Sequence, residues 1–328
     1  MTILVCGGAG YIGSHCVRQL QAAGYPCVVY DNLSTGHRAS VGGCELVEGD
    51  LRDRDKLKQV LLASGAEGVI HLAAFSLVGE SIAEPLMYYE NNLCGAISLL
   101  GAMKDSGVDK LVFSSTAAVY GEPEVVPVTE DSGALPVNPY GETKLAIEKL
   151  LHWCDGAYGI KSVSLRYFNA AGAAPEGNIG EDHRRETHLI PLVLQEALRQ
   201  NGSLQVFGND YPTRDGSCAR DYVHVLDLAD AHIRAFEYLK NGNASDYFNL
   251  GAGHGATVLE VIQTARQVTG VDINYTISGR RAGDPAALTA NAEKAARILG
   301  WAPARSDFRR IIQDAWAWHR SHPRGYED

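Results

Sequence analysis

The stretch ILVCGGAGYIG, at residues 3–13, decides which fold to expect. An apolar run, typical of a buried strand, is followed at once by Gly7, Gly10 and Gly13, spaced three apart. Glycine permits a tight turn from strand to helix and lets the backbone approach a phosphate, and the N-terminus of the helix offers free amides and the positive end of its dipole. The stretch therefore predicts a turn that binds the diphosphate of a dinucleotide, with a ligand-free glycine turn as the alternative.

An acidic residue closes the second apolar run, PCVVYDN at residues 26–32. Asp31 lies about 20 residues beyond the glycines, at the spacing where a carboxylate accepts a hydrogen bond from the ribose 2′-hydroxyl of a dinucleotide. A 2′-phosphate would be repelled by this carboxylate, so the sequence favours NAD over NADP as the cofactor.

The first half of the chain alternates apolar runs with helical patterns. We expect further strands at residues 68–74, 110–115 and 161–169, and helices at residues 12–24, 54–64 and 91–107. Such strand–helix–strand repeats predict the α/β fold class, with a doubly wound parallel sheet of the Rossmann type. From about residue 172 the pattern loosens into a loop. We therefore expect a Rossmann domain over residues 1–172, rejoined by a segment near 219–240, and a second, smaller α/β domain over 173–328.

The composition excludes several classes of protein. Hydrophobic residues make up 45% and charged residues 21% of the 328 residues, which predicts a packed core rather than disorder. The formal net charge of -10 gives no general attraction for nucleic acid or for anionic membranes. The seven cysteines include no CxxC pair, which favours reduced thiols in the cytoplasm. We see no signal peptide and no membrane-spanning run.

A tyrosine and a lysine stand four residues apart in NPYGETK, at residues 138–144. Tyr140 and Lys144 would share one face of a helix. The ordinary pKa of tyrosine is near 10, but an ammonium and the positive ring of an oxidised nicotinamide both favour the phenolate. Beside a dinucleotide turn, the pair predicts general acid–base chemistry next to a hydride carrier. FSSTAAVYG, at residues 113–121, adds hydroxyls at the carboxyl end of a strand, where open α/β sheets bind ligands.

Motifs along nearly the whole chain point to one family. They are GGAGYIGSH, DNLSTGH, GDLRD, HLAAFSLVGES, YYENN, FSSTAAVYG, PYGETK, RYFNAAGA, VFGNDYPTRDGSCARDYVHVLDLADAH, RRAGDP and LGW. In these motifs the chain resembles the extended short-chain dehydrogenase/reductases, and within them the branch that epimerises UDP-hexoses at C4. The segment FGNDYPTRDGSCARDYVHV is the most specific part of the match, because all relatives share the cofactor motifs.

The resemblance implies an NAD-dependent isomerase that interconverts UDP-galactose and UDP-glucose through a transient 4-keto sugar, with NAD tightly bound. Tyr140 would be the catalytic base, and Lys144 would be its partner and would bind the nicotinamide ribose. Thr116 would hydrogen-bond the sugar 4-oxygen. The other implied cofactor-binding positions are Gly7, Gly10, Tyr11, Ile12, Gly13, Asp31, Asn32, Asp50, Leu51, Asn91 and Phe168.

The resemblance also implies how the UDP-hexose is held. UDP would anchor the substrate in the second domain while the flat keto sugar turns over, so that hydride returns to its opposite face. Besides Thr116 and Tyr140, the implied substrate-binding positions are Asn169, Leu189, Phe207, Arg220, Arg281, Asp284 and Leu288, with Arg220 and Arg281 on the diphosphate. The resemblance further implies a homodimer made by helices near 91–107 and 142–154.

Several alternatives stay open. Leu288 is intermediate in size at a position that limits the sugar pocket, so activity on N-acetylated UDP-hexosamines is undecided. Sugar-nucleotide dehydratases place an acid pair directly after the hydroxyl residue, but Ala117 and Ala118 follow Thr116 here, which favours an epimerase. An enzyme acting on another nucleotide sugar is an alternative. So is a non-catalytic NAD-binding regulator, which is disfavoured because both members of the Tyr–Lys pair are present.

Two histidines in HRRETH, at residues 183–188, resemble a metal motif only superficially. They are five residues apart and lack the HExxH order of zinc enzymes. We therefore expect a solvated loop at this segment and no metal site in the protein.

Overall fold

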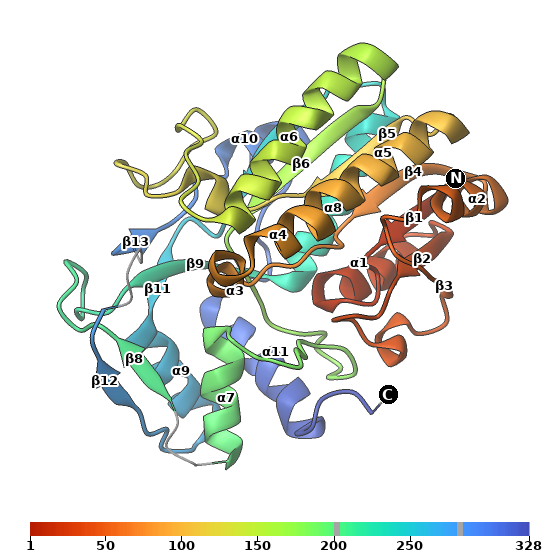
Figure 1. The fold of residues 1–328 in the computed structure, drawn as a ribbon. Coiled ribbons are helices and arrows are strands. Elements are labelled where there is room, and N and C mark those ends of the chain that lie inside the picture. Colours follow the sequence, from red (N-terminus) through yellow and green to blue (C-terminus); the bar gives the residue numbers. More distant parts are fainter. Residues whose placement is uncertain (200–203, 281–284, 328) are drawn as a thin grey trace.

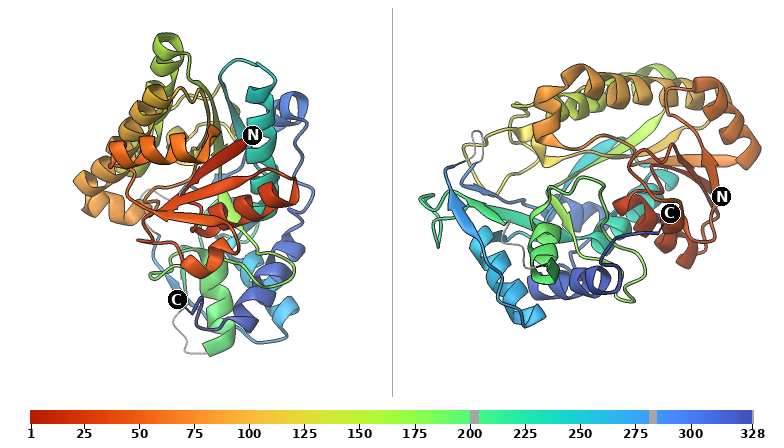
Figure 2. Two further views of the ribbon diagram at one scale, coloured as in Figure 1. Left: turned by 90° about the vertical axis from the view of Figure 1, so that its right-hand side faces the viewer. Right: turned by 60° about the horizontal axis from the view of Figure 1, so that its bottom comes forward.

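A seven-stranded parallel sheet forms the centre of the larger region (Figures 1 and 2). The computed structural model describes residues 1–199, 204–280 and 285–327. The strands follow the order β10-β6-β5-β4-β1-β2-β3, and each neighbouring pair is parallel. They are β1 (Thr2–Cys6), β2 (Cys27–Asp31), β3 (Glu45–Glu48), β4 (Ala66–His71), β5 (Lys110–Ser114), β6 (Lys161–Tyr167) and β10 (Asp246–Leu250). The predicted fold class, a doubly wound α/β sheet, is confirmed.

Helices cover both faces of this sheet, and a separate apolar core fills each interface. One face carries α1 (Tyr11–Ala22), α8 (Val225–Lys240) and α10 (Glu293–Leu299), and the other carries α2 (Arg54–Ser64), α5 (Gly95–Ser106) and α6 (Pro139–Tyr158). Shorter segments are η1 (Arg38–Val41), α3 (Val78–Ala83), α4 (Pro85–Tyr88), the π-turn η2 (Tyr89–Cys94) and η3 (Ala117–Tyr120). Because the central strands are buried on both sides, their sequences are apolar almost throughout.

The smaller region is built on short strands and three helices. Strands β11 (Gly255–Thr257), β13 (Ala287–Leu288) and β7 (Asn169–Ala171) all pair with β9 (Ala219–His224), and β8 (Gln205–Phe207) pairs with β12 (Thr276–Ser278). Helices α7 (Leu189–Arg199), α9 (Val258–Thr269) and α11 (Phe308–Ser321) pack together around one apolar core. Figure 1 shows this group of helices well away from α2, α5 and α6.

The chain crosses between the two regions more than once. β9 belongs to the small sheet, but α8 follows it directly and packs on the large sheet, which β10 then joins. The chain therefore returns to the large sheet with α8 and β10, up to residue 250, and again with α10, which goes beyond the predicted segment near 219–240. The division of the chain at residue 172 stays a prediction. None of the helices in the described ranges is long and apolar enough to cross a membrane.

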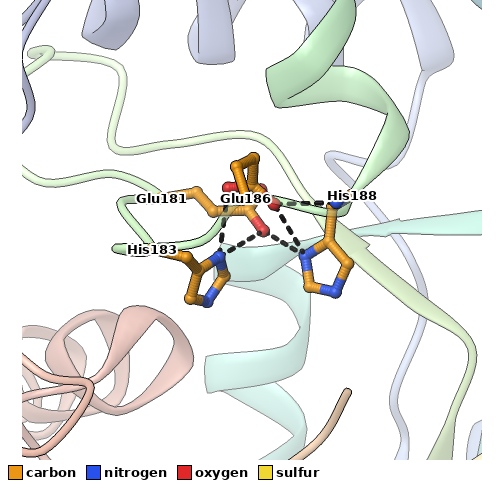
Figure 3. A group of neighbouring side chains, drawn as sticks. All are labelled: Glu181, His183, Glu186 and His188. Carbon is orange, nitrogen blue, oxygen red and sulfur yellow. Dashed lines mark hydrogen bonds and ion pairs between the residues drawn. The ribbon is translucent and has the colours of Figure 1, made fainter. Parts of the chain in front are cut away.

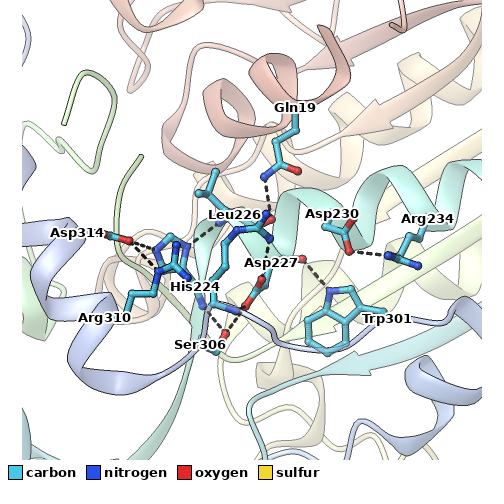
Figure 4. Close-up of polar contacts among 11 residues, drawn as sticks. Gln19, His224, Leu226, Asp227, Asp230, Arg234, Trp301, Ser306, Arg310 and Asp314 are labelled. Atoms are coloured by element: carbon cyan, nitrogen blue, oxygen red, sulfur yellow. Dashed lines mark hydrogen bonds and ion pairs between the residues drawn. The ribbon is translucent and has the colours of Figure 1, made fainter. Parts of the chain in front are cut away.

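Buried polar contacts fix the junction between β9 and α8 (Figure 4). The ring of His224 accepts a hydrogen bond from the Leu226 amide at 3.1 Å and contacts Asp314 of α11 at 3.1 Å. In the first turn of α8, the Asp227 carboxylate accepts a hydrogen bond from the Ser306 hydroxyl at 2.7 Å. Because Asp227 of α8 is bound to Ser306, just before α11, the two regions are held at a defined position relative to each other.

Candidate active site

In the glycine turn between β1 and α1, some glycines are required by packing within the protein and one leaves room for a ligand. Gly7 has φ +82°, and a Cβ at Gly13 would stand 2.0 Å from the Gly7 oxygen, so packing within the protein requires both glycines. A Cβ at Gly10 would meet, among the described residues, only the Gly7 oxygen at an ordinary 3.5 Å. Folding does not require glycine at position 10. The open space beside its backbone, at the N-terminus of α1, fits the diphosphate of a dinucleotide.

Asp31 lies at the end of β2, where its side chain is bound to the same turn. Its carboxylate accepts hydrogen bonds from the amides of Ala9 and Leu33, both at 2.9 Å. Burial raises the pKa of Asp31, and these amides oppose that shift. Asp31 therefore orients the glycine turn, and its contact with the ribose of a dinucleotide stays a prediction.

Tyr11 and Ile12 open α1, directly after the turn. The Tyr11 hydroxyl donates to the carbonyl of Gly172 at 2.6 Å, while Ile12 packs against the core beside α1. The amides in the first turn of a helix have no partner within the helix. They are consequently positioned to bind an anionic ligand placed beside the glycine turn.

Three further predicted cofactor positions follow β2 and β3. The Asn32 side chain accepts from the Ser34 amide at 3.1 Å. The Asp50 carboxylate accepts from the Arg52 guanidinium at 2.9 and 2.7 Å, and this pairing lowers the pKa of Asp50 to about 2. Leu51 is partly buried against the core under α2 and α5.

Asn91 lies in the π-turn η2, and its side chain donates to Asn92 at 3.0 Å. Asn92 is buried and in turn holds the Phe75 amide at 2.9 Å and the Thr143 hydroxyl of α6 at 3.2 Å. Asn92 was not among the predicted site residues. Its role in joining η2 to the start of α6 depends on a contact between segments about fifty residues apart, which the sequence does not reveal.

The predicted catalytic residues lie together at the carboxyl end of β5. Tyr140 is in the first turn of α6, which begins where Asn138 accepts from the Gly141 amide at 2.9 Å. Thr116 lies close enough to the Tyr140 hydroxyl to lower the pKa of that hydroxyl. The Lys144 ammonium is buried, donates to the Ser114 carbonyl at 2.7 Å and lies 5.9 Å from the centre of the Tyr140 ring. The structure thus brings a hydroxyl, a phenol and an amine to one place.

Burial dominates the protonation of this group. It raises the pKa of Tyr140 above its ordinary value of 10.0, more than the nearby Thr116 hydroxyl lowers it. Burial also lowers the pKa of Lys144 to about 7, against the opposing charge of Glu148. In the protein by itself, burial therefore opposes the phenolate form of Tyr140. The positive ring of an oxidised nicotinamide would have to supply the missing stabilisation.

A buried polar network lies next to the catalytic group. The sequence analysis did not predict it. Glu148, one turn after Lys144 on α6, accepts from the Ser115 hydroxyl at 2.5 Å and from two nitrogens of Arg166 at 2.9 and 2.5 Å. Arg166 also donates to the Tyr120 hydroxyl at 2.9 Å. The sequence did contain a signal for this network. Arg166 is a charged residue within the apolar strand β6, and a buried charge needs a partner.

On the substrate side, three predicted residues meet at the small sheet. Asn169 in β7 donates to the Asp221 carbonyl at 3.1 Å, and Arg220 in β9 donates to the Pro285 carbonyl at 2.8 Å. Leu288 in β13 is the register partner of Arg220. The adjoining strands therefore place an amide, a guanidinium and an apolar side chain on one surface.

The other predicted substrate residues are more dispersed. Phe168, a predicted cofactor contact, and Leu288 pack against the same core beside η3. Leu189 begins α7 and packs into the core of the smaller region, and Phe207 ends β8. The predicted positions Arg281 and Asp284 lie outside the described residues.

Comparison with known proteins defines the class. The model of the NAD dependent epimerase/dehydratase family matches residues 3–251, and the chain belongs to this family. The resemblance inferred from the motifs is thereby confirmed, and so is the expectation of NAD as the cofactor of the class.

Comparison with individual relatives indicates which enzymes of this family the chain is similar to. The chain is 55% identical to a UDP-glucose 4-epimerase of Lacticaseibacillus casei, over 100% of this chain and 99% of that protein. It is 45% identical to the Brucella ovis UDP-glucose 4-epimerase solved in complex with NAD, with a TM-score of 0.94 and coverage of 96% and 97%. The UDP-glucose 4-epimerase of Bifidobacterium longum, solved with NAD+ and UDP, is 36% identical, with a TM-score of 0.93 and coverage of 99% and 100%.

Proposed function

We propose that this protein catalyses the reversible 4-epimerisation of UDP-galactose and UDP-glucose. The observation that carries the proposal is the convergence of Thr116, Tyr140 and Lys144 at the carboxyl end of β5, beside a glycine turn that fits a dinucleotide. The full-length similarity to UDP-glucose 4-epimerases supports the choice of substrate. When bound, NAD would accept a hydride from the sugar and return it.

Each residue of the catalytic group has a task that follows from its position. Tyr140 would take the proton from the 4-hydroxyl and later give it back, since its phenol is the titratable group beside Thr116. Thr116 would hold the sugar 4-oxygen in line with Tyr140. Lys144, held by the Ser114 carbonyl, would orient the cofactor ribose and carry the positive charge that favours the phenolate.

The small sheet would hold the UDP part of the substrate. The Arg220 guanidinium would bind the diphosphate, and Asn169 and Leu288 would contact the substrate on the same surface. Leu189 and Phe207, from α7 and β8, would complete the UDP site together with Arg281 and Asp284. The sugar itself would be held by few groups, because it must present both faces during the reaction.

The test of this function uses the purified protein without added cofactor. Incubation with UDP-galactose should produce UDP-glucose, detected by chromatography, and Tyr140→Phe is the matched control. Conversion by the wild-type protein alone would establish both the reaction and tightly bound NAD. No conversion, even after NAD is added, would refute the proposed substrate.

The protein would act as a homodimer through α5 and α6. Each helix exposes a large apolar side chain: Ile97 on α5 is 52% exposed and Trp153 on α6 is 72% exposed. Exposed apolar residues on adjoining helices favour an intermolecular contact. Trp153→Glu should halve the molar mass measured by light scattering, whereas Ile277→Glu, at an exposed apolar residue of β12, should not. An unchanged mass for Trp153→Glu would exclude this surface.

The free cysteine thiols of the protein are consistent with a reducing compartment. All seven cysteines are free, including Cys27 and Cys44, whose sulfur atoms are 3.4 Å apart. This supports a cytoplasmic location for the enzyme. Fractionation of cells that produce the protein would test it, and recovery outside the cytoplasm would contradict it.

A further inference from the structure

Two histidines and two glutamates converge in the segment that leads into α7 (Figure 3). Glu181, His183, Glu186 and His188 each present one potential ligand atom, and these atoms all lie within 4.8 Å of one another. As predicted, residues 183–188 form a loop, in which Arg184, Arg185, Thr187 and His188 are exposed. The Glu181 and Glu186 side chains, however, are only 4% and 7% exposed, while those of His183 and His188 are 25% and 46% exposed. The loop folds back on itself and directs four metal-binding side chains to one point.

The distances between these atoms suit a small ion. Nδ1 of His183 lies 3.1 Å from a Glu186 oxygen and 3.5 Å from a Glu181 oxygen. Nδ1 of His188 lies 2.5 Å from the same Glu181 oxygen and 3.9 Å from a Glu186 oxygen. Ligand atoms bound tetrahedrally at zinc distances are separated by roughly 3.3–3.6 Å. The observed separations lie on both sides of that value, so small side-chain rotations would complete the geometry.

The surrounding contacts orient the ligands. One oxygen of Glu186 accepts from the amides of Thr187 and His188, both at 2.7 Å, and its other oxygen faces His183. The carbonyl of Glu181 accepts from the buried indole of Trp318 at 3.0 Å. Metal sites commonly show hydrogen bonds of this kind, which hold a ligand or its backbone in place.

We propose that Glu181, His183, Glu186 and His188 form a binding site for one divalent transition metal ion, with Zn²⁺ as the ion that fits best. Two neutral imidazoles and two carboxylates balance the charge of such an ion, and four nitrogen and oxygen ligands suit tetrahedral zinc. All four positions carry ligands from the protein, which is typical of a structural rather than a catalytic site. The site is independent of the proposed epimerase reaction.

The position of the site indicates what the ion would do. The His183 ring lies edge-on to Tyr11, which opens α1 beside the glycine turn, with ring centres 6.5 Å apart. His188 immediately precedes Leu189, the first residue of α7 and a proposed substrate contact. A bound ion would therefore hold the segment between the proposed cofactor and substrate sites in one conformation.

The alternative is a pair of ion pairs without a metal. Burial lowers the pKa of His188, but the charge and hydrogen bond of Glu181 outweigh this and raise the pKa to about 9. Two protonated histidines would then neutralise the two glutamates. Metal binding and ion pairing differ in a quantity that can be measured directly, the amount of metal bound per chain.

The experiment measures metal content on the full-length protein. Wild-type protein dialysed against Zn²⁺ and then desalted should hold about one zinc per chain by plasma mass spectrometry. His183→Ala and His188→Ala should hold little, because loss of a ligand weakens binding by more than the roughly 10–100-fold that loss of an outer contact costs. The matched control, His152→Ala, removes an exposed histidine of α6 and should keep the metal. Zinc-free wild-type protein, or equal zinc in all variants, would overturn the proposal.

A second measurement covers the case in which the variants do not fold. Wild-type protein stripped with a chelator and titrated with Co²⁺ should develop the visible absorption of a tetrahedral site, saturating at one equivalent. Its melting temperature should rise on addition of Zn²⁺. A spectrum of hydrated Co²⁺ with no change in melting temperature would support the ion pairs and refute the metal site. Neither readout depends on epimerase activity.

Discussion

Replacing Gly10 by alanine should weaken NAD binding and leave the stability of the protein nearly unchanged. The backbone of Gly10 has φ −79° and ψ 176°, values that any residue adopts, and the new Cβ would lie 3.5 Å from the Gly7 oxygen. The expected loss of stability is below about 1 kcal/mol, the typical effect of alanine at a helix N-cap. Gly13→Ala is the contrasting change. Its Cβ would stand 2.0 Å from the Gly7 oxygen and 2.8 Å from the Gly8 Cα, atoms that cannot move aside without distorting the turn.

The effect on NAD follows from the same geometry. If the cofactor diphosphate rests against the backbone at Gly10, a methyl group there displaces it from the amides that begin α1. Losing one hydrogen bond to a charged group costs about 1.5–3 kcal/mol, which corresponds to roughly a 10–100-fold weaker affinity. Gly13→Ala should instead destabilise the protein by about 1–3 kcal/mol or more, as overpacked substitutions do.

Two measurements separate these effects: the urea midpoint of unfolding and the NAD content after purification, followed by calorimetric titration of the stripped protein. Gly133→Ala, where a Cβ meets open space in a surface loop, is the matched control and should change neither. Wild-type NAD affinity in Gly10→Ala would refute the placement of the diphosphate at this turn. A collapse of its stability would refute the claim that folding does not need glycine there.

Three other changes test the catalytic group and its surroundings. Tyr140→Phe should reduce turnover by about 10²–10⁴-fold while the NAD content stays constant, and near-normal turnover would exclude Tyr140 as the base. Burial lowers the pKa of Lys144 from 10.5 to about 7, so the unfolded chain binds more protons between these values and the stability of the ligand-free protein should rise with pH across that window. Lys144→Met should flatten this rise in urea midpoints measured near pH 7 and near pH 10; an unchanged slope would mean that another group causes it. Leu288→Tyr should preserve UDP-galactose turnover and reduce any activity on N-acetylated UDP-hexosamines, and equal losses would show that this residue does not select by size.

The fold could be predicted from sequence where local signals agree. The helix predicted over 54–64 has those bounds because Asp53 caps its first turn, accepting from the Lys56 amide, and Gly65 ends it in the left-handed region. The run ILVC before the glycines is typical of a strand buried on both faces, and β1 confirms it. Where signals were weak, elements were missed. β10, DYFNL, lies at an edge of the sheet and is too short to stand out, and the start of the helix predicted over 91–107 is a π-turn.

The candidate site, like the fold, could be predicted from the sequence only in part. The helical spacing of Tyr140 and Lys144 was readable from the sequence. The approach of Tyr140 to Thr116 and the hydrogen bond from Lys144 to Ser114 depend instead on how α6 docks against β5. The Glu181–His188 cluster escaped prediction because spacing rules for metal ligands describe regular helices. A loop can bring side chains together at spacings that no helix would allow.

The connection between the two regions suits the proposal that UDP would be held firmly while the sugar is held by few groups. β6 ends at Tyr167, next to the catalytic residues, and β7 begins at Asn169, so a single residue separates the large sheet from the small one. β7 pairs with β9, which carries Arg220, and β9 runs directly into α8 on the large sheet. Two short connections of this kind fix the proposed diphosphate site at a set distance from Tyr140. A substrate anchored at the diphosphate can then rotate its hexose about the remaining bonds and still bring either face of C4 to the same base, which is the geometry that epimerisation requires.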